Sequence, residues 1–156
     1  MMSLVLIDTN VLLRTSRPTD PQCAVAISAQ AILRSRGDSP CLVAQNIIEF
    51  RAVATRPDVV NGLGMSQADA NAEILALKSL YPVYLDEPAL LAEWERLVQA
   101  VGSVGKQNHD ARLVAAMTIH RIETLLTFNK VDFTRYTHIT VLTPDEVVAA
   151  AAGPET

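Results

Sequence analysis

The sequence predicts an α/β fold, a three-layer sandwich in which helices flank a central, mainly parallel sheet of four to five strands. Two observations lead to this fold class. Residues 4–7 form an uninterrupted apolar run, which is typical of a strand buried on both faces of a parallel sheet. Strand-like and helix-like segments also alternate along the chain, as they do in β-α-β units. In such sheets the functional side chains lie outside the carboxyl ends of the strands.

Turn-forming and helix-capping residues bound the expected elements. Asp20 caps a helix whose first residue is Pro21. Ser66 with Asp69 three residues later has the form of a capping box, and Pro57 ends the helix before it. The expected strands are 4–7, 41–43, 83–85, 124–128 and 139–142, and the expected helices are 21–36, 45–55, 67–80, 88–101, 107–122 and a short one from 144. Residues 38–40 form a turn.

Length and composition indicate one packable domain. The chain has 156 residues, of which 49% are hydrophobic and 19% charged, so we expect a single domain at 1–150 and a disordered tail at 151–156. No apolar run approaches the roughly 20 residues of a membrane span, and the N-terminus lacks a secretory signal, so the expected location is the cytoplasm. Cys23 and Cys41 lack metal-binding spacing and are expected to be free, buried or half-buried thiols. The net charge of −4 disfavours broad electrostatic binding of a nucleic-acid backbone.

Four acidic residues stand among apolar neighbours, where a carboxylate is unfavourable. They are Asp8 at the end of the first strand, Glu49 between Ile48 and Phe50, Asp110 on an apolar helix face, and Asp132 between Val131 and Phe133. Burial of unpaired carboxylates must be compensated, and we expect all four to converge at one edge of the sheet. An all-oxygen pocket suits Mg²⁺ or Mn²⁺ and disfavours Zn²⁺.

Each acid also has an ordinary structural explanation. Asp8 and Asp110 would cap helices, Asp132 would form a turn, and Glu49 would pair with an arginine. The arginines considered for Glu49 are Arg14, Arg51 and Arg112. Four acids together, with hydroxyl and amide side chains beside them, favour a shared site over four separate explanations. These neighbouring polar residues are Thr9, Asn10, Thr127 and Asn129.

Four segments resemble the PIN-domain ribonucleases and, among them, toxins of the VapC type. They are Val5–Asn10, Asn46–Phe50, Gly105–Ala111 and Leu126–Phe133, and their order and spacing cover nearly the whole chain. The resemblance implies a PIN-like fold and a metal-dependent endoribonuclease that leaves a 5′ phosphate and a 3′ hydroxyl. It places the catalytic and metal-binding roles on Asp8, Glu49, Asp110 and Asp132, with Mg²⁺ or Mn²⁺ as cofactor.

Neighbouring polar residues receive supporting roles. Asn10 and Thr127 would fix the orientation of the carboxylates, as outer residues of metal sites commonly do. Asn129 is a neutral alternative to Asp132 at the fourth ligand position. His109, next to Asp110, would act on the leaving group, although a packed or solvent-facing imidazole is the more ordinary explanation.

The resemblance also implies partners. In VapC-like proteins the region that corresponds to residues 45–80 helps form a groove for the apolar helix of an antitoxin. We therefore expect an RNA substrate, a small antitoxin protein and a homodimer, with no membrane association. One alternative is a non-catalytic PIN-like domain that binds protein or RNA. The other is an aspartate-based phosphotransfer enzyme in which Asp8 is phosphorylated, and Asn10 disfavours it because that chemistry places a second aspartate there.

Overall fold

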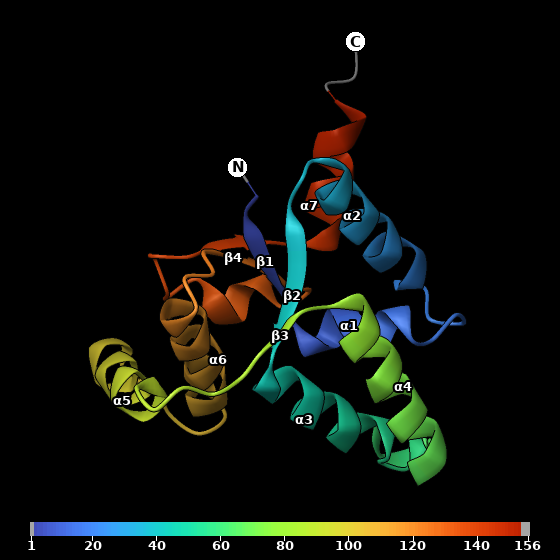
Figure 1. The fold of residues 1–156 in the computed structure, drawn as a ribbon, viewed down its shortest axis with the longest axis horizontal. Coiled ribbons are helices and arrows are strands. Elements are labelled where there is room, and N and C mark those ends of the chain that lie inside the picture. Colours follow the sequence, from blue (N-terminus) through green and yellow to red (C-terminus); the bar gives the residue numbers. More distant parts are fainter. Residues whose placement is uncertain (1, 154–156) are drawn as a thin grey trace.

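The computed structural model describes residues 2–153, in which a five-stranded sheet lies between two layers of helices (Figure 1). The strands are β1 (Leu4–Ile7), β2 (Ser39–Val43), β3 (Val83–Tyr84), β4 (Thr124–Leu126) and β5 (Thr140–Leu142). Their order is β3-β2-β1-β4-β5, and every neighbouring pair is parallel. The predicted three-layer α/β sandwich is therefore confirmed, with β1 at the centre of the sheet.

The helices divide between the two faces of the sheet. They are α1 (Thr9–Thr15), α2 (Cys23–Ser35), α3 (Ala44–Ala54), α4 (Gln67–Leu80), α5 (Leu90–Val101), α6 (Gln107–Ile119) and α7 (Pro144–Ala152), with short 3₁₀ helices η1 (Asp58–Val60) and η2 (Lys130–Phe133). Helices α1–α4 and α7 build one hydrophobic core, and α5 and α6 build the other. The sheet lies between the two cores.

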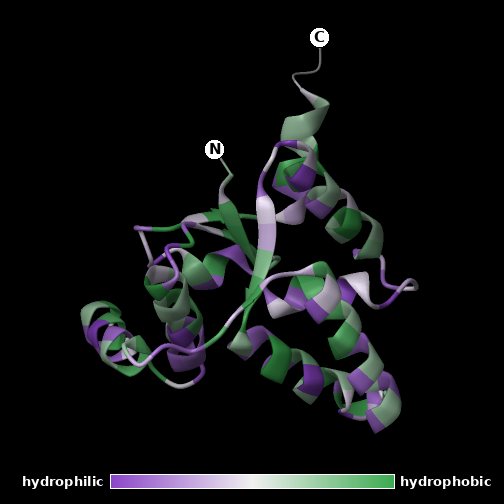
Figure 2. Ribbon diagram, viewed as in Figure 1, coloured by the Kyte–Doolittle hydropathy of each residue, from purple (hydrophilic) through white to green (hydrophobic). Residues whose placement is uncertain are grey.

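Strand β1 supplies both cores because its side chains alternate between the two faces of the sheet. Val5 and Ile7 pack into the core of α1–α4 and α7, and Leu6 packs into the core of α5 and α6. Figure 2 shows β1 as hydrophobic along its length, whereas the surrounding helices mix hydrophobic and hydrophilic residues. The apolar run that predicted a strand buried on both faces is thus explained.

Several element boundaries differ from the expectation. Helix α1 was not predicted, and α2 begins at Cys23 rather than at Pro21. Asp20 accepts a hydrogen bond from the Gln22 backbone in the turn that precedes α2. The expected turn at 38–40 is wrong for Ser39 and Pro40, which belong to β2. Helix α6 ends at 119 and β4 at 126, before the expected ends at 122 and 128.

The C-terminal expectation is wrong in part. Helix α7 extends to Ala152, so residues 151–152 are helical, whereas residues 154–156 of the expected tail lie outside the described residues. Both cysteines are free and buried, as predicted. In the part of the chain that the structure describes, no helix is both long and apolar enough to cross a bilayer.

Candidate active site

Asp8 occupies the carboxyl end of the central strand and is held by three hydrogen bonds. Its Oδ1 accepts from the Thr9 backbone N–H at 2.8 Å, which makes Asp8 the N-cap residue of α1. Its Oδ2 accepts from Thr127 Oγ1 at 2.7 Å and from Asn10 Nδ2 at 3.2 Å. The helix-cap explanation for Asp8 is therefore correct for one oxygen, and the other oxygen is oriented by the two polar residues that the sequence placed beside it.

Burial changes the acid strength of Asp8. The side chain is almost fully removed from water, and this desolvation raises its pKa to about 6. The hydrogen bonds from Thr127 and Thr9 oppose the shift, and the negative charges of Glu49 and Asp110 add to it. The electrostatic influence of these two acids places them near Asp8, although they come from different helices.

Glu49 reaches the same edge of the sheet from α3. Its Oε2 accepts from Thr9 Oγ1 at 2.9 Å, and Thr9 is also the residue whose backbone binds Asp8. Its Oε1 accepts from Gln45 Nε2 at 2.6 Å. Glu49 is half-buried and forms no ion pair with any described residue.

The proposed arginine partners of Glu49 are engaged elsewhere. Arg14 pairs with Asp20, Arg51 donates to Asn71, and Arg112 pairs with Asp86. The explanation of Glu49 as half of an ion pair is therefore wrong.

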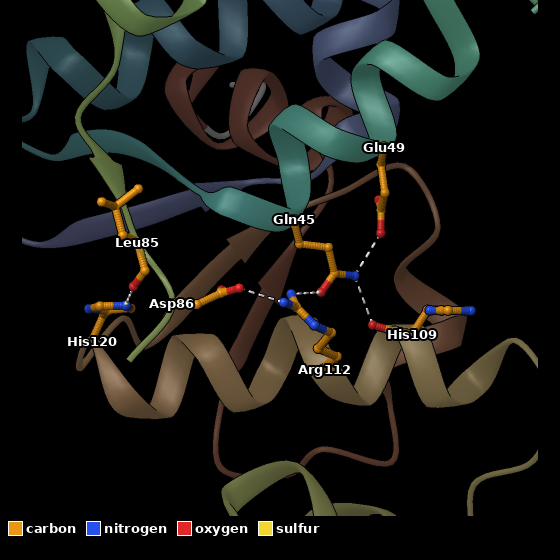
Figure 3. Close-up of polar contacts among 7 residues, drawn as sticks. All are labelled: Gln45, Glu49, Leu85, Asp86, His109, Arg112 and His120. Atoms are coloured by element: carbon orange, nitrogen blue, oxygen red, sulfur yellow. Dashed lines mark hydrogen bonds and ion pairs between the residues drawn. The ribbon is translucent and has the colours of Figure 1, made fainter. Parts of the chain in front are cut away.

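A chain of polar contacts fixes Glu49 against α6 (Figure 3). Gln45, one helical turn before Glu49, donates to both Glu49 and the His109 backbone carbonyl, the latter at 2.9 Å. Arg112 donates to Gln45 Oε1 at 3.0 Å and to Asp86 at 2.7 Å, which directs the amide nitrogen of Gln45 toward Glu49. The sequence analysis missed Gln45, although its i, i+4 spacing to Glu49 was a visible signal.

Asp110 and Asp132 complete the set of acids. Asp110 lies in the first turn of α6 and Asp132 in η2, and both are half-buried. Desolvation raises the pKa of Asp110, and the nearby charges of Asp132 and Glu49 raise it further, whereas Lys106 and Arg135 lower it. Helix α6 is not capped by a side chain, so Asp110 is not the helix cap that the alternative explanation required.

The other predicted residues lie beside this acidic edge. Asn129 is exposed and contributes its backbone N–H, which donates to Thr127 Oγ1 at 3.0 Å. His109 contributes its backbone carbonyl to Gln45, while no described residue hydrogen-bonds its ring. Asp132, which acts on Asp110, is therefore better placed than Asn129 to share a ligand with the other acids.

The carboxylates are spread more widely than one ion would require. Within residues 2–153, no three His, Cys, Asp or Glu side chains are arranged so that they could hold a metal ion. The expectation that Asp8, Glu49 and Asp110 lie within common ion-binding reach is therefore not met as the side chains stand, because hydrogen bonds from Thr9 and Gln45 hold Glu49 in its own position. The donor set still fits a hard divalent cation, since every donor is an oxygen and the acids repel one another.

Asn46 joins the structural elements that carry the site. Its side chain is fully buried, accepts from the Val43 backbone at 2.9 Å and donates to the Ile7 carbonyl and to Thr9 Oγ1. These contacts attach the start of α3 to the end of β1. Loss of the amide leaves buried backbone groups without partners.

We expect Asn46→Ala to lower the free energy of unfolding by about 3 kcal/mol, measured by urea denaturation. The matched control is Asn71→Ala, which removes an exposed amide in α4 that contacts Arg51. It should change the stability by less than about 0.5 kcal/mol. Equal effects of the two substitutions would show that the buried amide does not fasten α3 to β1.

The raised pKa of Asp8 predicts a pH dependence of stability in chelator. Because the native pKa of about 6 exceeds the ordinary value of 3.8, the native state binds the proton more tightly, and stability falls as pH rises between these values. The free energy of unfolding of Asp8→Asn minus that of the wild type should therefore increase by on the order of 3 kcal/mol between pH 4 and pH 7. Parallel urea-unfolding profiles of the two proteins would contradict the burial of this charge.

Comparisons with known proteins give a consistent fold. No protein-family model and no curated protein matches the chain. Among solved structures, VapBC2 from Rickettsia felis bound to promoter DNA aligns with a TM-score of 0.68 and 10% identity over 90% of this chain and 98% of the other. A toxin-antitoxin complex from Klebsiella pneumoniae gives 0.61 and 21% over 90% and 97%, and the Sarcin-Ricin loop cleaving toxin VapC20 of Mycobacterium tuberculosis gives 0.64 and 18% over 86% and 96%.

The chain has the PIN-domain fold. At these identities the likeness concerns the fold, and the PIN fold alone assigns no activity to this chain. The feature of this chain that suggests an activity is its acidic edge, the set of four acids Asp8, Glu49, Asp110 and Asp132. Asp8 follows β1, and the other three lie in α3, α6 and η2. The edge lies at the carboxyl end of β1, and the strand order reverses between β1 and β4, which is where open α/β sheets place their ligands.

Proposed function

We propose that this chain is a metal-dependent endoribonuclease and the toxin of a toxin–antitoxin pair. The observation that carries the proposal is the acidic edge, where four carboxylates gather from different parts of the chain and none forms an ion pair with a described residue. Burial and neighbouring acids raise the pKa of two of them, Asp8 and Asp110. Repulsion between neighbouring carboxylates destabilises the folded state, whereas a site that binds cations requires several carboxylates close together. The neighbour VapC20, a Sarcin-Ricin loop cleaving toxin, supports RNA as the substrate.

Asp8, Glu49, Asp110 and Asp132 would hold one or two Mg²⁺ or Mn²⁺ ions. When bound, such an ion supplies a Lewis acid that activates water and stabilises charge at the phosphodiester. Thr127 and Asn10 keep Asp8 oriented through their hydrogen bonds, and Gln45 does the same for Glu49. Glu49 and Asp110 reach an ion together only by rotating their side chains from the positions described here.

The chain's own cations receive the substrate. Lys106 and Arg135 lie near enough to Asp110 to lower its pKa, so they provide positive charge for RNA phosphates beside the acids. This local arrangement agrees with a chain whose net charge is negative, because only the immediate surroundings of the acidic edge need to attract a polyanion.

The phosphotransfer alternative conflicts with the geometry of Asp8. An aspartate that attacks phosphorus needs a free carboxylate oxygen exposed to the substrate. Both oxygens of Asp8 accept hydrogen bonds, and the residue is only 8% exposed. Asp8 is therefore suited to be an oriented ligand and not a nucleophile.

A cleavage assay on mixed cellular RNA tests the function. With millimolar Mg²⁺ or Mn²⁺ the purified protein should shorten RNA and leave 5′-phosphate and 3′-hydroxyl ends, and excess EDTA should stop the reaction. RNA that binds without being cut would support the non-catalytic alternative. Products with 2′,3′-cyclic phosphate ends would contradict hydrolysis by activated water.

The partner proposals concern the surface of α2 and α4. Exposed apolar residues of the two helices, Ile27 and Leu80, line a cavity of about 420 Å³ between them. An apolar antitoxin helix suits such a surface, and the neighbours include VapBC and toxin-antitoxin complexes. Overproduction without an antitoxin should arrest growth.

For the proposed homodimer, light scattering should give twice the mass of 16.9 kDa, and a strict monomer would contradict it.

A further inference from the structure

A separate cavity opens beside the acidic edge, between the start of α5 and α6. Its volume is about 470 Å³, within the range of small-ligand sites. Its walls are mainly apolar and come from Pro88, Leu90, Leu91 and Trp94, while His109 and Arg112 supply polar groups from α6. The Trp94 ring is fixed in place because its Nε1 donates to the Asn108 carbonyl at 2.8 Å.

The shape and chemistry of this cavity match a nucleobase. A base has two apolar faces, which stack on aromatic and aliphatic side chains, and a polar edge that needs both donors and acceptors. The Arg112 guanidinium donates to Gln45 and Asp86 and keeps further N–H groups as donors, and the Glu87 carboxylate, which also lines the cavity, is an acceptor. The apolar walls alone would suit many ligands, and these two charged groups narrow the choice.

The cavity and the acids share residues of α6. Arg112 lines the cavity and donates to the side-chain amide of Gln45, and the same amide donates to Glu49. A single amide group therefore lies between Arg112 and Glu49 (Figure 3). On the other side, His109 lines the cavity and immediately precedes Asp110 in α6. A nucleotide next to a phosphodiester held at the acids would therefore place its base at the cavity.

The charge around the cavity complements an RNA strand. The acidic edge itself repels phosphates, but Lys106, Arg112 and Arg135 lie on or beside α6. A strand that crosses from the acids to the cavity along α6 passes these cations, of which Arg112 is also paired with Asp86. Electrostatics thus directs the strand toward the α5 side of the site.

We propose that the cavity between α5 and α6 binds the base of a nucleotide adjacent to the cleaved bond, a role that rests on the ribonuclease function proposed above. Stacking on Trp94 and the apolar wall supplies affinity, and Arg112 and Glu87 contact the edge of the base. Because Arg112 also donates to Gln45, a base held by Arg112 helps to keep the Glu49 carboxylate in its position at the acidic edge.

Trp94 is the only tryptophan in the chain, so its fluorescence reports directly on this cavity. Titration with each of the four nucleoside 5′-monophosphates, in EDTA and with excitation at 295 nm, should quench the emission with saturation in the millimolar range. Because no metal is present, this readout does not depend on cleavage. Differences among the four nucleotides would give the base preference.

The variant Leu91→Glu changes a cavity wall at a position 64% exposed, so folding should be preserved, and Leu91→Gln separates loss of apolar surface from added charge. Leu75→Glu makes the same change at a position 69% exposed on α4 and is the matched control. Both Leu91 variants should weaken nucleotide quenching and raise the KM for a short RNA about 10-fold, whereas the control should not. Thermal unfolding checks that all three variants fold.

The failures of the two proposals can be told apart. Saturable quenching that the Leu91 variants abolish, in a protein that cleaves no RNA with metal, would refute the nuclease and leave a nucleotide site. Active cleavage without quenching, or with an unchanged KM in both Leu91 variants, would overturn the base site. A dimer that dissociates on Leu91→Glu, again without quenching, would show that a second copy covers the cavity and would also overturn it.

Discussion

Asp110→Asn should reduce metal-dependent RNA cleavage by at least on the order of 10²-fold while the protein stays fully folded. The substitution keeps the shape of the side chain but removes a carboxylate that two other acids already destabilise. No described residue donates a hydrogen bond or an ion pair to Asp110, so the folded state loses no polar partner. In chelator the variant should therefore melt at or above the temperature of the wild type.

The matched control is Asp145→Asn, which removes the same charge from an exposed position in the first turn of α7. It should leave cleavage unchanged. If Asp110→Asn is markedly less stable in chelator yet still cleaves RNA, Asp110 is a structural residue and the proposed site loses its central acid.

Addition of divalent cation should raise the melting temperature of the wild type by about 5 °C or more at a concentration well above its Kd. The reason is mass action, since a cation that binds the native acids and not the unfolded chain stabilises the native state. The repulsion that raises the pKa values of Asp8 and Asp110 is relieved at the same time.

Differential scanning fluorimetry with Mg²⁺ and Mn²⁺, each against EDTA, measures this shift. Asp110→Asn should show a much smaller shift than the wild type, and Asp145→Asn the same shift. A shift of equal size in all three proteins would indicate cation binding elsewhere on the chain and would count against the acidic edge.

The central parts of the fold were predictable because their signals are local. The apolar run of β1 and the Ser66 cap of α4 each depend on neighbours within a few residues, and both predictions are confirmed. Pro40 was expected in a turn at residues 38–40 but lies in β2. It is tolerated in β2 because β3 pairs only with the later residues Leu42 and Val43, so no hydrogen bond from β3 is lost.

Helix α1 was missed because no element was predicted between the first strand and Asp20. The helix forms because Asp8 caps it and because Val11 and Leu12 are fully buried beneath it, a tertiary effect that outweighs weak local propensity. Its consequence for the site is direct, since α1 carries Thr9 and Asn10 against Glu49 and Asp8.

The acids of the site were predictable, whereas the contacts that hold them were not. Each acid is conspicuous in the sequence because its neighbours are apolar. The contact of Gln45 with His109 and Arg112 depends on how α3 packs beside α6, and no local pattern encodes the pairing of two helices that are about 60 residues apart. For the same reason the sequence suggested Arg112 as a partner of Glu49. In the structure Arg112 donates to Gln45, and Gln45 in turn donates to Glu49.

Mn²⁺ binding tests most directly whether the four acids together bind a divalent cation. Electron paramagnetic resonance measures free Mn²⁺ in a titration and so yields both affinity and stoichiometry without any RNA. We expect one or two Mn²⁺ ions per chain in the wild type and in Asp145→Asn, and at least 10-fold weaker binding in Asp110→Asn and Glu49→Gln. Equal binding in all four proteins, or none in the wild type at millimolar Mn²⁺, would contradict the claim.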